Sequence, residues 1–289
     1  MASSSRYESE FETIVNNHND LERDPTRQFI RFNKVVGIGT SKRVYEGLDT
    51  YNGIKIAWSK IEVGEITEAE SNKRCQEAEM MKSLNHQNIL KCYTYWYDGR
   101  KFINIITDLC SSGNLRDYIL KHDLFHCTVK LAGFGVAVYK EAEYVNNASG
   151  GTPEYMAPEI YRGKMYNELV DIHSFGMTVL QMVTYDKIYC EYEGLDYLND
   201  VIAAVEAGFF PVALSKVDDY DPQLLQFIQK CVAPASLRPA ALELFREPFL
   251  VATGEHDRSQ DRPTPSRFRS LRKLSLTRKS RAYTQFDSI

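Results

Sequence analysis

The chain has no long hydrophobic run and no paired cysteines. None of its apolar stretches approaches the ~18 residues of a membrane-spanning helix, and its first residues contain neither a secretory apolar core nor a glycine for myristoylation. The six cysteines are dispersed without a CxxC pair, as is typical of reduced thiols. These absences predict an intracellular protein without a transmembrane segment, in the cytoplasm or, as the alternative, in the nucleus.

Signals for metal and nucleic-acid binding are also missing. His122, His126 and Cys127 lie at helical spacing, but no fourth ligand is evident, so we expect surface histidines and no metal site. The aromatic and groove-reading motifs of nucleic-acid-binding proteins are absent. With 43% hydrophobic and 26% charged residues, the composition predicts one globular domain with tails.

Charge is distributed unevenly along the chain. The net charge is −4, yet from Arg258 onward nine Lys or Arg face two Asp. In this region Phe268, Leu271 and Leu274 recur every three residues among basic side chains. This pattern predicts either a basic amphipathic helix for an acidic partner or membrane surface, or a solvated disordered tail.

A glycine-containing hairpin is the first sign of a nucleotide site. Gly37 and Gly39 follow one strand-like apolar stretch and precede another. Glycines there let backbone N–H groups approach phosphates without a side-chain clash. In the phosphate-covering pattern GxGxxGxV, Lys42 stands where the third glycine is expected, and Val44 follows at the valine position.

The next strand, residues 53–59, lacks the lysine that would pair with nucleotide phosphates. Ala57 keeps its place, but Ser59 occupies the lysine position of the pattern VAIK. Lys60 is adjacent, yet successive strand side chains point to opposite faces, so it should point away from the site. Lys42 on the preceding strand is therefore the better cationic candidate.

Several further motifs follow in order. They are a helix with Glu77, a hinge-like run with Asp108 and Cys110, the run Gly151–Glu159, a helix beginning near Asp171, and Arg238. Together with the missing strand lysine, they resemble the WNK (with-no-lysine) serine/threonine protein kinase family, in its plant type. The matches span about residues 24–250, and their order and spacing are hard to obtain by chance.

The resemblance implies an α+β, protein-kinase-like two-lobed fold. We expect a flexible acidic segment at 1–28, a small antiparallel-sheet lobe at about 29–108, an incomplete, mainly helical lobe at about 109–250, and a basic tail at 251–289. The implied structural motifs are Gly133, Phe134, Gly135, Ala157, Pro158, Asp171, and Arg238 paired with Glu159. The implied ATP-binding residues are Gly37, Gly39, Lys42, Val44, Ala57, Glu77, Asp108 and Cys110.

The catalytic loop has no clear counterpart. The kinase signature HRDLxxxN holds the catalytic aspartate and a magnesium-binding asparagine. His122-Asp123-Leu124 is the nearest match, but it lacks the arginine, and Thr128 stands at the asparagine position. About two dozen residues separate Asp108 from Gly133, where a kinase fits two helices of ~11 residues or more and the loop. We therefore expect a helix and the catalytic loop to be deleted.

The metal-binding aspartate is also replaced. Residues 128–135 resemble the strand and DFG motif that follow the catalytic loop, with Gly133 in place of the aspartate. Phe134 and Met81 should keep their places in the apolar stack of kinases. Since removing the metal ligand and the base each costs orders of magnitude in rate, the sequence predicts a pseudokinase that binds ATP weakly and for which Mg²⁺ is doubtful.

Two alternatives stay open. One is an active Ser/Thr protein kinase in which Lys42 serves phosphate binding and an unrecognised carboxylate, Asp123 or Glu154, replaces the lost groups. The other is a non-enzymatic truncated product that acts through its basic tail. In the pseudokinase interpretation, the chain works through protein partners that the sequence does not identify.

Overall fold

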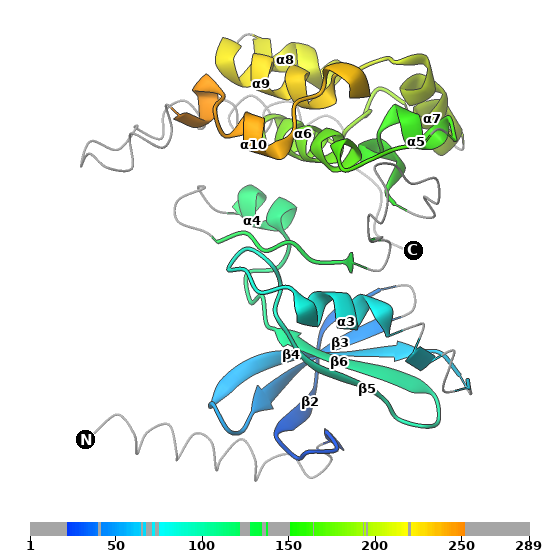
Figure 1. Cartoon of the computed structure of the whole chain (residues 1–289), viewed down its shortest axis with the longest axis vertical. Coiled ribbons are helices and arrows are strands. Elements are labelled where there is room, and N and C mark those ends of the chain that lie inside the picture. Colours follow the sequence, from blue (N-terminus) through cyan, green and yellow to red (C-terminus); the bar gives the residue numbers. More distant parts are fainter. Residues whose placement is uncertain are drawn as a thin grey trace, which may run out of the picture. The chain divides into compact units, whose positions relative to one another are not determined.

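The computed structural model describes residues 22–39, 42–64, 66–67, 71–72, 75–121, 128–134, 137, 151–163, 165–192, 194, 196–218 and 221–251. They form two compact units, one built on a β-sheet and one mainly of helices (Figure 1). The sheet unit runs to Tyr118 and also includes segment 128–134 and Ala137. The predicted α+β class, with a sheet lobe and a helical lobe, is confirmed.

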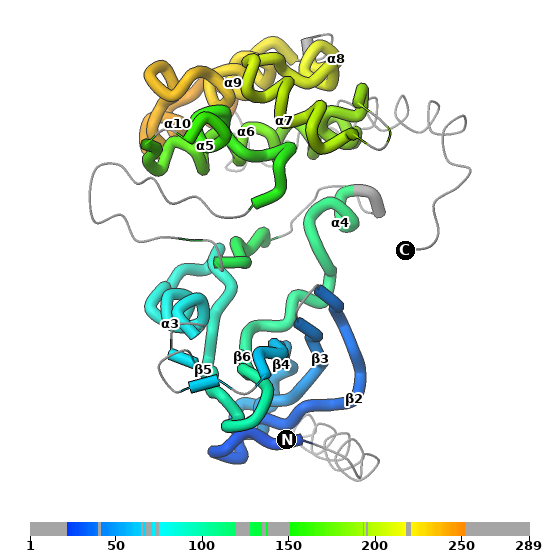
Figure 2. The backbone as a smooth tube through the Cα atoms, turned by 90° about the vertical axis from the view of Figure 1, so that its right-hand side faces the viewer, coloured from blue at the N-terminus to red at the C-terminus, as the bar shows by residue number. Residues whose placement is uncertain are grey.

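One antiparallel sheet forms the body of the first unit. Its strand order is β1-β2-β3-β4-β6-β5, and helix α3 (Gln76–Ser83) packs against β5 (Figure 2). The strands are β1 (Glu22–Arg23), β2 (Phe29–Ile38), β3 (Lys42–Asp49), β4 (Ile54–Glu62), β5 (Cys92–Tyr97) and β6 (Phe102–Asp108).

Apolar side chains cover both faces of this sheet. Because side chains alternate along a strand, neighbours such as Ile105 and Ile106 enter different clusters. One cluster joins the sheet to α3 and contains Cys75, Ala78, Met81, Cys92, Ile103 and Ile105. The other contains Phe29, Ile56, Trp58 and Ile106.

Part of the segment that the sequence assigned to a flexible N-terminus is ordered. Residues 22–28 contain strand β1 and a turn in which buried Asp24 accepts hydrogen bonds from the N–H groups of Thr26 (2.9 Å) and Phe29 (2.7 Å). An aspartate that caps a turn in this way satisfies backbone donors that would otherwise lose their water. The ordered unit therefore begins before residue 29.

Helix α4 (Leu115–Lys121) follows the sheet, and the helical unit is centred on α6. Its other elements are η2 (Pro153–Tyr155), α5 (Pro158–Tyr161), α6 (Leu169–Thr184), α7 (Tyr197–Ala207), η3 (Val212–Leu214), α8 (Ser215–Asp218), α9 (Pro222–Val232), η4 (Ala235–Leu237) and α10 (Ala241–Leu244). No helix in the described part of the chain is long and apolar enough to span a membrane.

The crossing of α6 and α9 has a local cause. Gly176 lets the helices approach closely, since a Cβ at this position would lie 2.5 Å from the Cβ of Cys231. Helix α9 starts at Pro222 because Asp221 caps it, accepting from the N–H groups of Gln223 (3.0 Å) and Leu224 (3.2 Å). Met177 and Leu180 of α6 and Ile228 of α9 are then fully buried in one cluster.

A buried ion pair ties α5 to the chain after α9. The fully buried Arg238 guanidinium donates to both Glu159 carboxylate oxygens, at 2.6 and 3.3 Å, as the resemblance implied. It also donates to the carbonyl oxygens of Leu169 (2.7 Å) and Ala233 (3.1 Å). One side chain therefore joins segments that are distant in the sequence.

We expect Arg238→Met to destabilise the helical unit by about 3–5 kcal/mol, because it leaves the Glu159 carboxylate buried without its partner. Urea unfolding followed by far-ultraviolet circular dichroism measures this. The matched control is Lys101→Met, which breaks the exposed Lys101–Glu62 pair (2.6 Å) and should cost less than about 1 kcal/mol. Equal costs for both variants would contradict a structural role for Arg238.

Candidate nucleotide-binding site

The predicted phosphate-covering hairpin is formed by β2 and β3. Gly37 lies opposite Val44 in the sheet, and the Gly39 N–H donates to the Lys42 carbonyl oxygen at 2.8 Å. Residues 40 and 41 lie outside the described part of the chain. The hairpin thus brings Gly37, Gly39, Lys42 and Val44 together, as the spacing predicted.

The register of β3 and β4 separates the two candidate lysines. Val44 lies opposite Ser59 and Lys42 opposite Ile61, so these side chains share one sheet face. Lys60 points to the other face, where its Nζ lies 2.8 Å from Glu22 Oε1 and 4.6 Å from the Phe102 ring centroid. Lys42 is exposed and forms no ion pair with any described residue. Ala57, two residues before Ser59, is buried on the same face as Lys42.

Glu77 lies on helix α3, and its side chain is half-buried. Burial raises the pKa of the Cys92 thiol on β5 to about 11, and the nearby Glu77 charge adds to the shift. Within the described ranges, neither Glu77 nor Lys42 forms an ion pair, so the two are not joined to each other.

Asp108 ends β6, and its carboxylate is fully engaged. It accepts from Tyr93 Oη (2.8 Å), Lys130 Nζ (2.9 Å) and the Lys91 N–H (3.3 Å). Burial acts to raise the pKa of this carboxyl, but the hydrogen bonds from Lys130 and Tyr93 hold it below its ordinary value. Cys110 follows and is exposed. Sequence reasoning missed the roles of Tyr93, which belongs to no recognised motif, and of Lys130, which lies in the run 128–135 but had no expected role.

Segment 128–134 packs against the rest of the sheet unit. Leu131 forms a parallel bridge with Ile89, through its N–H to the Asn88 carbonyl oxygen (2.7 Å) and its own carbonyl oxygen to the Leu90 N–H (2.9 Å). Asn88 Nδ2 also donates to the Val129 carbonyl oxygen at 2.9 Å. Residues 128–131 are therefore held at the place where the strand before the DFG-like motif was expected.

The DFG-like residues follow this bridge. Phe134 packs against the cluster that contains Met81, as the resemblance implied. Gly133 has φ +83°, and a Cβ built on it would meet no atom within 4 Å. The segment thus keeps the aromatic contact, while position 133 carries no carboxylate.

The remaining predicted residues lie in the helical unit or outside the described ranges. Ala157 is buried and precedes Pro158 at the start of α5. Asp171, in the first turn of α6, is exposed, and its carboxylate has no hydrogen bond to a described residue. Glu154, the alternative carboxylate, accepts from Tyr197 Oη at 2.9 Å. Asp123 and Gly135 lie outside the described residues, as do residues 252–289. No group of His, Cys, Asp or Glu in the described ranges could hold a metal ion.

The Asp108–Lys130 pair predicts a pH dependence. A carboxyl whose pKa is lowered on folding stabilises the fold above its unfolded value and loses that contribution as the pH falls below about 4. Hydrogen-exchange protection of the Leu131 amide, corrected for intrinsic rates, should therefore fall in acid. In Asp108→Asn the protection should be low already at neutral pH. Asp98→Asn, which alters only the β5–β6 turn, is the control; an unchanged pH profile in Asp108→Asn would contradict the assignment.

The protein kinase domain family matches residues 30–128 and 123–250, in two overlapping pieces. The "Probable serine/threonine-protein kinase WNK6" of Oryza sativa subsp. japonica is 35% identical over 286 residues, which cover 83% of this chain and 63% of the relative. The "Serine/threonine-protein kinase WNK8" of Arabidopsis thaliana is 35% identical over 282 residues, covering 82% of this chain and 48% of the relative.

A further relative is the "Probable serine/threonine-protein kinase WNK10" of Arabidopsis thaliana, 35% identical over 283 residues that cover 82% of this chain and 52% of the relative. The chain thus spans between 48% and 63% of the length of these three relatives. Together with the kinase-domain match, these identities show that the chain belongs to the plant WNK type of serine/threonine protein kinase.

Proposed function

We propose that this chain is a WNK-type pseudokinase that binds ATP through its sheet unit and acts through protein contacts. One observation carries the proposal: Lys42 shares a sheet face with Ser59, whereas position 133 carries no carboxylate. A phosphate-binding cation is thus retained and a metal ligand is lost. Phosphoryl transfer needs both, together with an aspartate that accepts the substrate proton.

In this proposal the nucleotide lies under the β2–β3 hairpin. The glycine-containing backbone of residues 37–39 covers the phosphates, and the Lys42 ammonium neutralises part of their charge. Ala57 and Val44 contact the base, and Glu77 orients the site from α3. Because the Asp108 carboxylate is engaged by Lys130 and Tyr93, the main chain of residues 109–110 is left to hydrogen-bond the base.

The proposed loss of the catalytic loop has support in the comparisons. The family match falls into two separate pieces, which overlap at residues 123–128. The alignment with the rice relative runs over 286 residues, whereas 83% of this 289-residue chain is about 240 residues. About 45 aligned positions of that relative thus have no counterpart here. ATP binding would then need no Mg²⁺, since the residues that usually hold it are missing. We place the protein in the cytoplasm, with the nucleus as the alternative.

Thermal unfolding of the full chain with millimolar ATP, with and without Mg²⁺, tests the nucleotide site. A ligand that binds only the folded state raises the transition, by about 2.7 kcal/mol of stability at a hundred times Kd. We expect a shift that does not depend on Mg²⁺ and that disappears in Lys42→Ala. Arg43→Ala is the matched control, because Arg43 is also exposed but lies opposite Lys60, on the other face. An equal loss in both variants would mean general electrostatic attraction only.

Phosphoryl transfer separates the proposal from the active-kinase alternative, which the names of the relatives favour. The proposal expects no transfer to protein Ser or Thr beyond that of a preparation carrying Lys42→Ala. Transfer that vanishes in Lys42→Ala would establish an active kinase. Asp123→Asn and Glu154→Gln would then show which carboxylate replaces the lost base.

Restoring the metal ligand gives a further prediction. Gly133→Asp places a carboxylate in open space, at a positive φ that Asp tolerates better than most residues. We expect the ATP-induced thermal shift to become Mg²⁺-dependent, while transfer stays absent because the proton-accepting aspartate is still missing. Gly133→Asn, which has the same shape without the charge, is the control. Transfer gained by Gly133→Asp alone would contradict the proposed loss of the loop.

A further inference from the structure

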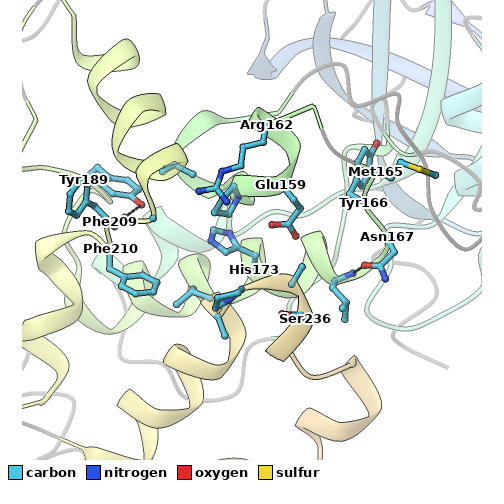
Figure 3. Close-up of a pocket in the computed structure, with 18 residues that line it drawn as sticks. Glu159, Arg162, Met165, Tyr166, Asn167, His173, Tyr189, Phe209, Phe210 and Ser236 are labelled. Atoms are coloured by element: carbon cyan, nitrogen blue, oxygen red, sulfur yellow. Dashed lines mark hydrogen bonds between the residues drawn. The ribbon is translucent and has the colours of Figure 1, made fainter.

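The helical unit contains a cavity that the proposed nucleotide site does not use. Its volume is about 500 Å³, within the range of sites that hold small ligands or peptide side chains. Residues of α5, the chain before α6, the end of α7 and the chain after α9 line it. In Figure 3, Tyr189, Phe209 and Phe210 gather on one side of the cavity and Met165, Tyr166 and Asn167 on the other, with His173 between them.

His173 gives this cavity a hydrogen-bond acceptor. Its ring is 3% exposed, and its Nδ1 lies 3.3 Å from the Tyr155 carbonyl oxygen. A carbonyl oxygen can only accept, so Nδ1 carries the proton. Burial and the nearby Arg238 charge lower the pKa of His173 to about 4, which leaves the ring neutral at neutral pH. Nε2 is then an unprotonated acceptor, and no described residue donates to it.

The ionised side chains that line the cavity are either paired or exposed to water. The Glu159 carboxylate is paired with Arg238 through two hydrogen bonds. Arg162, which is exposed, donates to the Glu206 carbonyl oxygen. Because moving a charged group from water to this apolar lining would be costly without a free partner, the cavity favours a neutral ligand.

The mouth of the cavity is apolar and exposed. Phe209 is 65% exposed, Phe210 is 52% exposed and Met165 is 61% exposed. Exposed aromatic and methionine side chains around a cavity are typical of surfaces that another protein covers. A side chain that enters from a peptide would bury this rim together with the cavity, whereas a small free ligand would leave the rim in water.

We propose that this cavity binds the tyrosine side chain of a partner protein, with the ring beside Phe209 and Phe210 and the hydroxyl donating to His173 Nε2. Tyrosine combines a large apolar ring with one donor, and a buried tyrosine hydroxyl usually finds a partner. The ligand is neutral, in keeping with a lining whose carboxylate is paired with Arg238 and whose other guanidinium, that of Arg162, is exposed to water. This docking site is independent of nucleotide binding and gives a chain without catalytic groups a means of protein recognition.

The test compares N-acetyl-L-tyrosine amide with N-acetyl-L-phenylalanine amide, which differ by one hydroxyl. Binding to the full chain is measured by NMR with methyl-labelled methionine, so that Met165 reports on the cavity. We expect saturable shifts of the Met165 signal and about five-fold tighter binding of the tyrosine amide, the effect of one net hydrogen bond. No binding, or equal affinities, would overturn the proposal. Tighter binding of N-acetyl-L-tryptophan amide would overturn the choice of tyrosine.

Variants locate the hydroxyl and the ring separately. His173→Phe keeps a ring but removes the acceptor, so the preference for the tyrosine amide should vanish; a preserved preference would exclude His173 as the partner. Phe209→Ala, at an exposed position, should weaken both amides without unfolding the chain. Leu242→Ala, at a 71% exposed position outside the cavity, should change neither. If His173→Phe does not fold, the wild-type comparison and Phe209→Ala still decide the proposal.

Discussion

The antiparallel register between β3 and β4 is the constraint on which the nucleotide side of the sheet unit depends. Val44 opposite Ser59 places Lys42 on the same face, and the two-residue period of a strand sends Lys60 to the other. A strand cannot turn one side chain over without turning its neighbours. Lys60 therefore cannot share the face of its neighbour Ser59, whereas Lys42 on the neighbouring strand does share it. Glu22 and the Phe102 ring then hold Lys60 on its own side.

In segment 128–134, the packing of the DFG-like residues is kept although position 133 carries no carboxylate. Backbone hydrogen bonds to residues 88–90 and the Lys130–Asp108 pair hold residues 128–131 on the sheet unit. Phe134 then reaches the cluster around Met81, because burial requires only an apolar side chain of suitable volume. A metal ion requires a carboxylate at one defined position, and Gly133 has none. The DFG-like residues can therefore keep their packing without a carboxylate that would bind a metal ion.

Among the described residues of the helical unit, one face of α6 packs into the core and the opposite face carries exposed side chains. Met177 and Leu180 are almost fully buried. The ion pair between Arg238 and Glu159 holds α5 in place. Asp171 and Phe175, one turn apart on the other side, are exposed, Phe175 by 47%, although its ring meets Phe227 edge-on at 6.2 Å. Each Å² of apolar surface that stays exposed forgoes ~25 cal/mol of burial.

The sequence by itself determined the family, the fold class and the two substituted positions, Ser59 and Gly133, because these follow from motif order and from the identity of single residues. Alternation along a strand was also enough to separate Lys60 from Lys42. Only the tertiary structure decided that Lys130 and Tyr93 engage Asp108, that residues 22–28 join the ordered unit, and that His173 lines a cavity. These contacts join residues separated by 22 and 15 positions, or by 18 in the case of His173 and Tyr155. No local pattern encodes them, because they arise where the fold brings distant segments together and removes water from the groups between them.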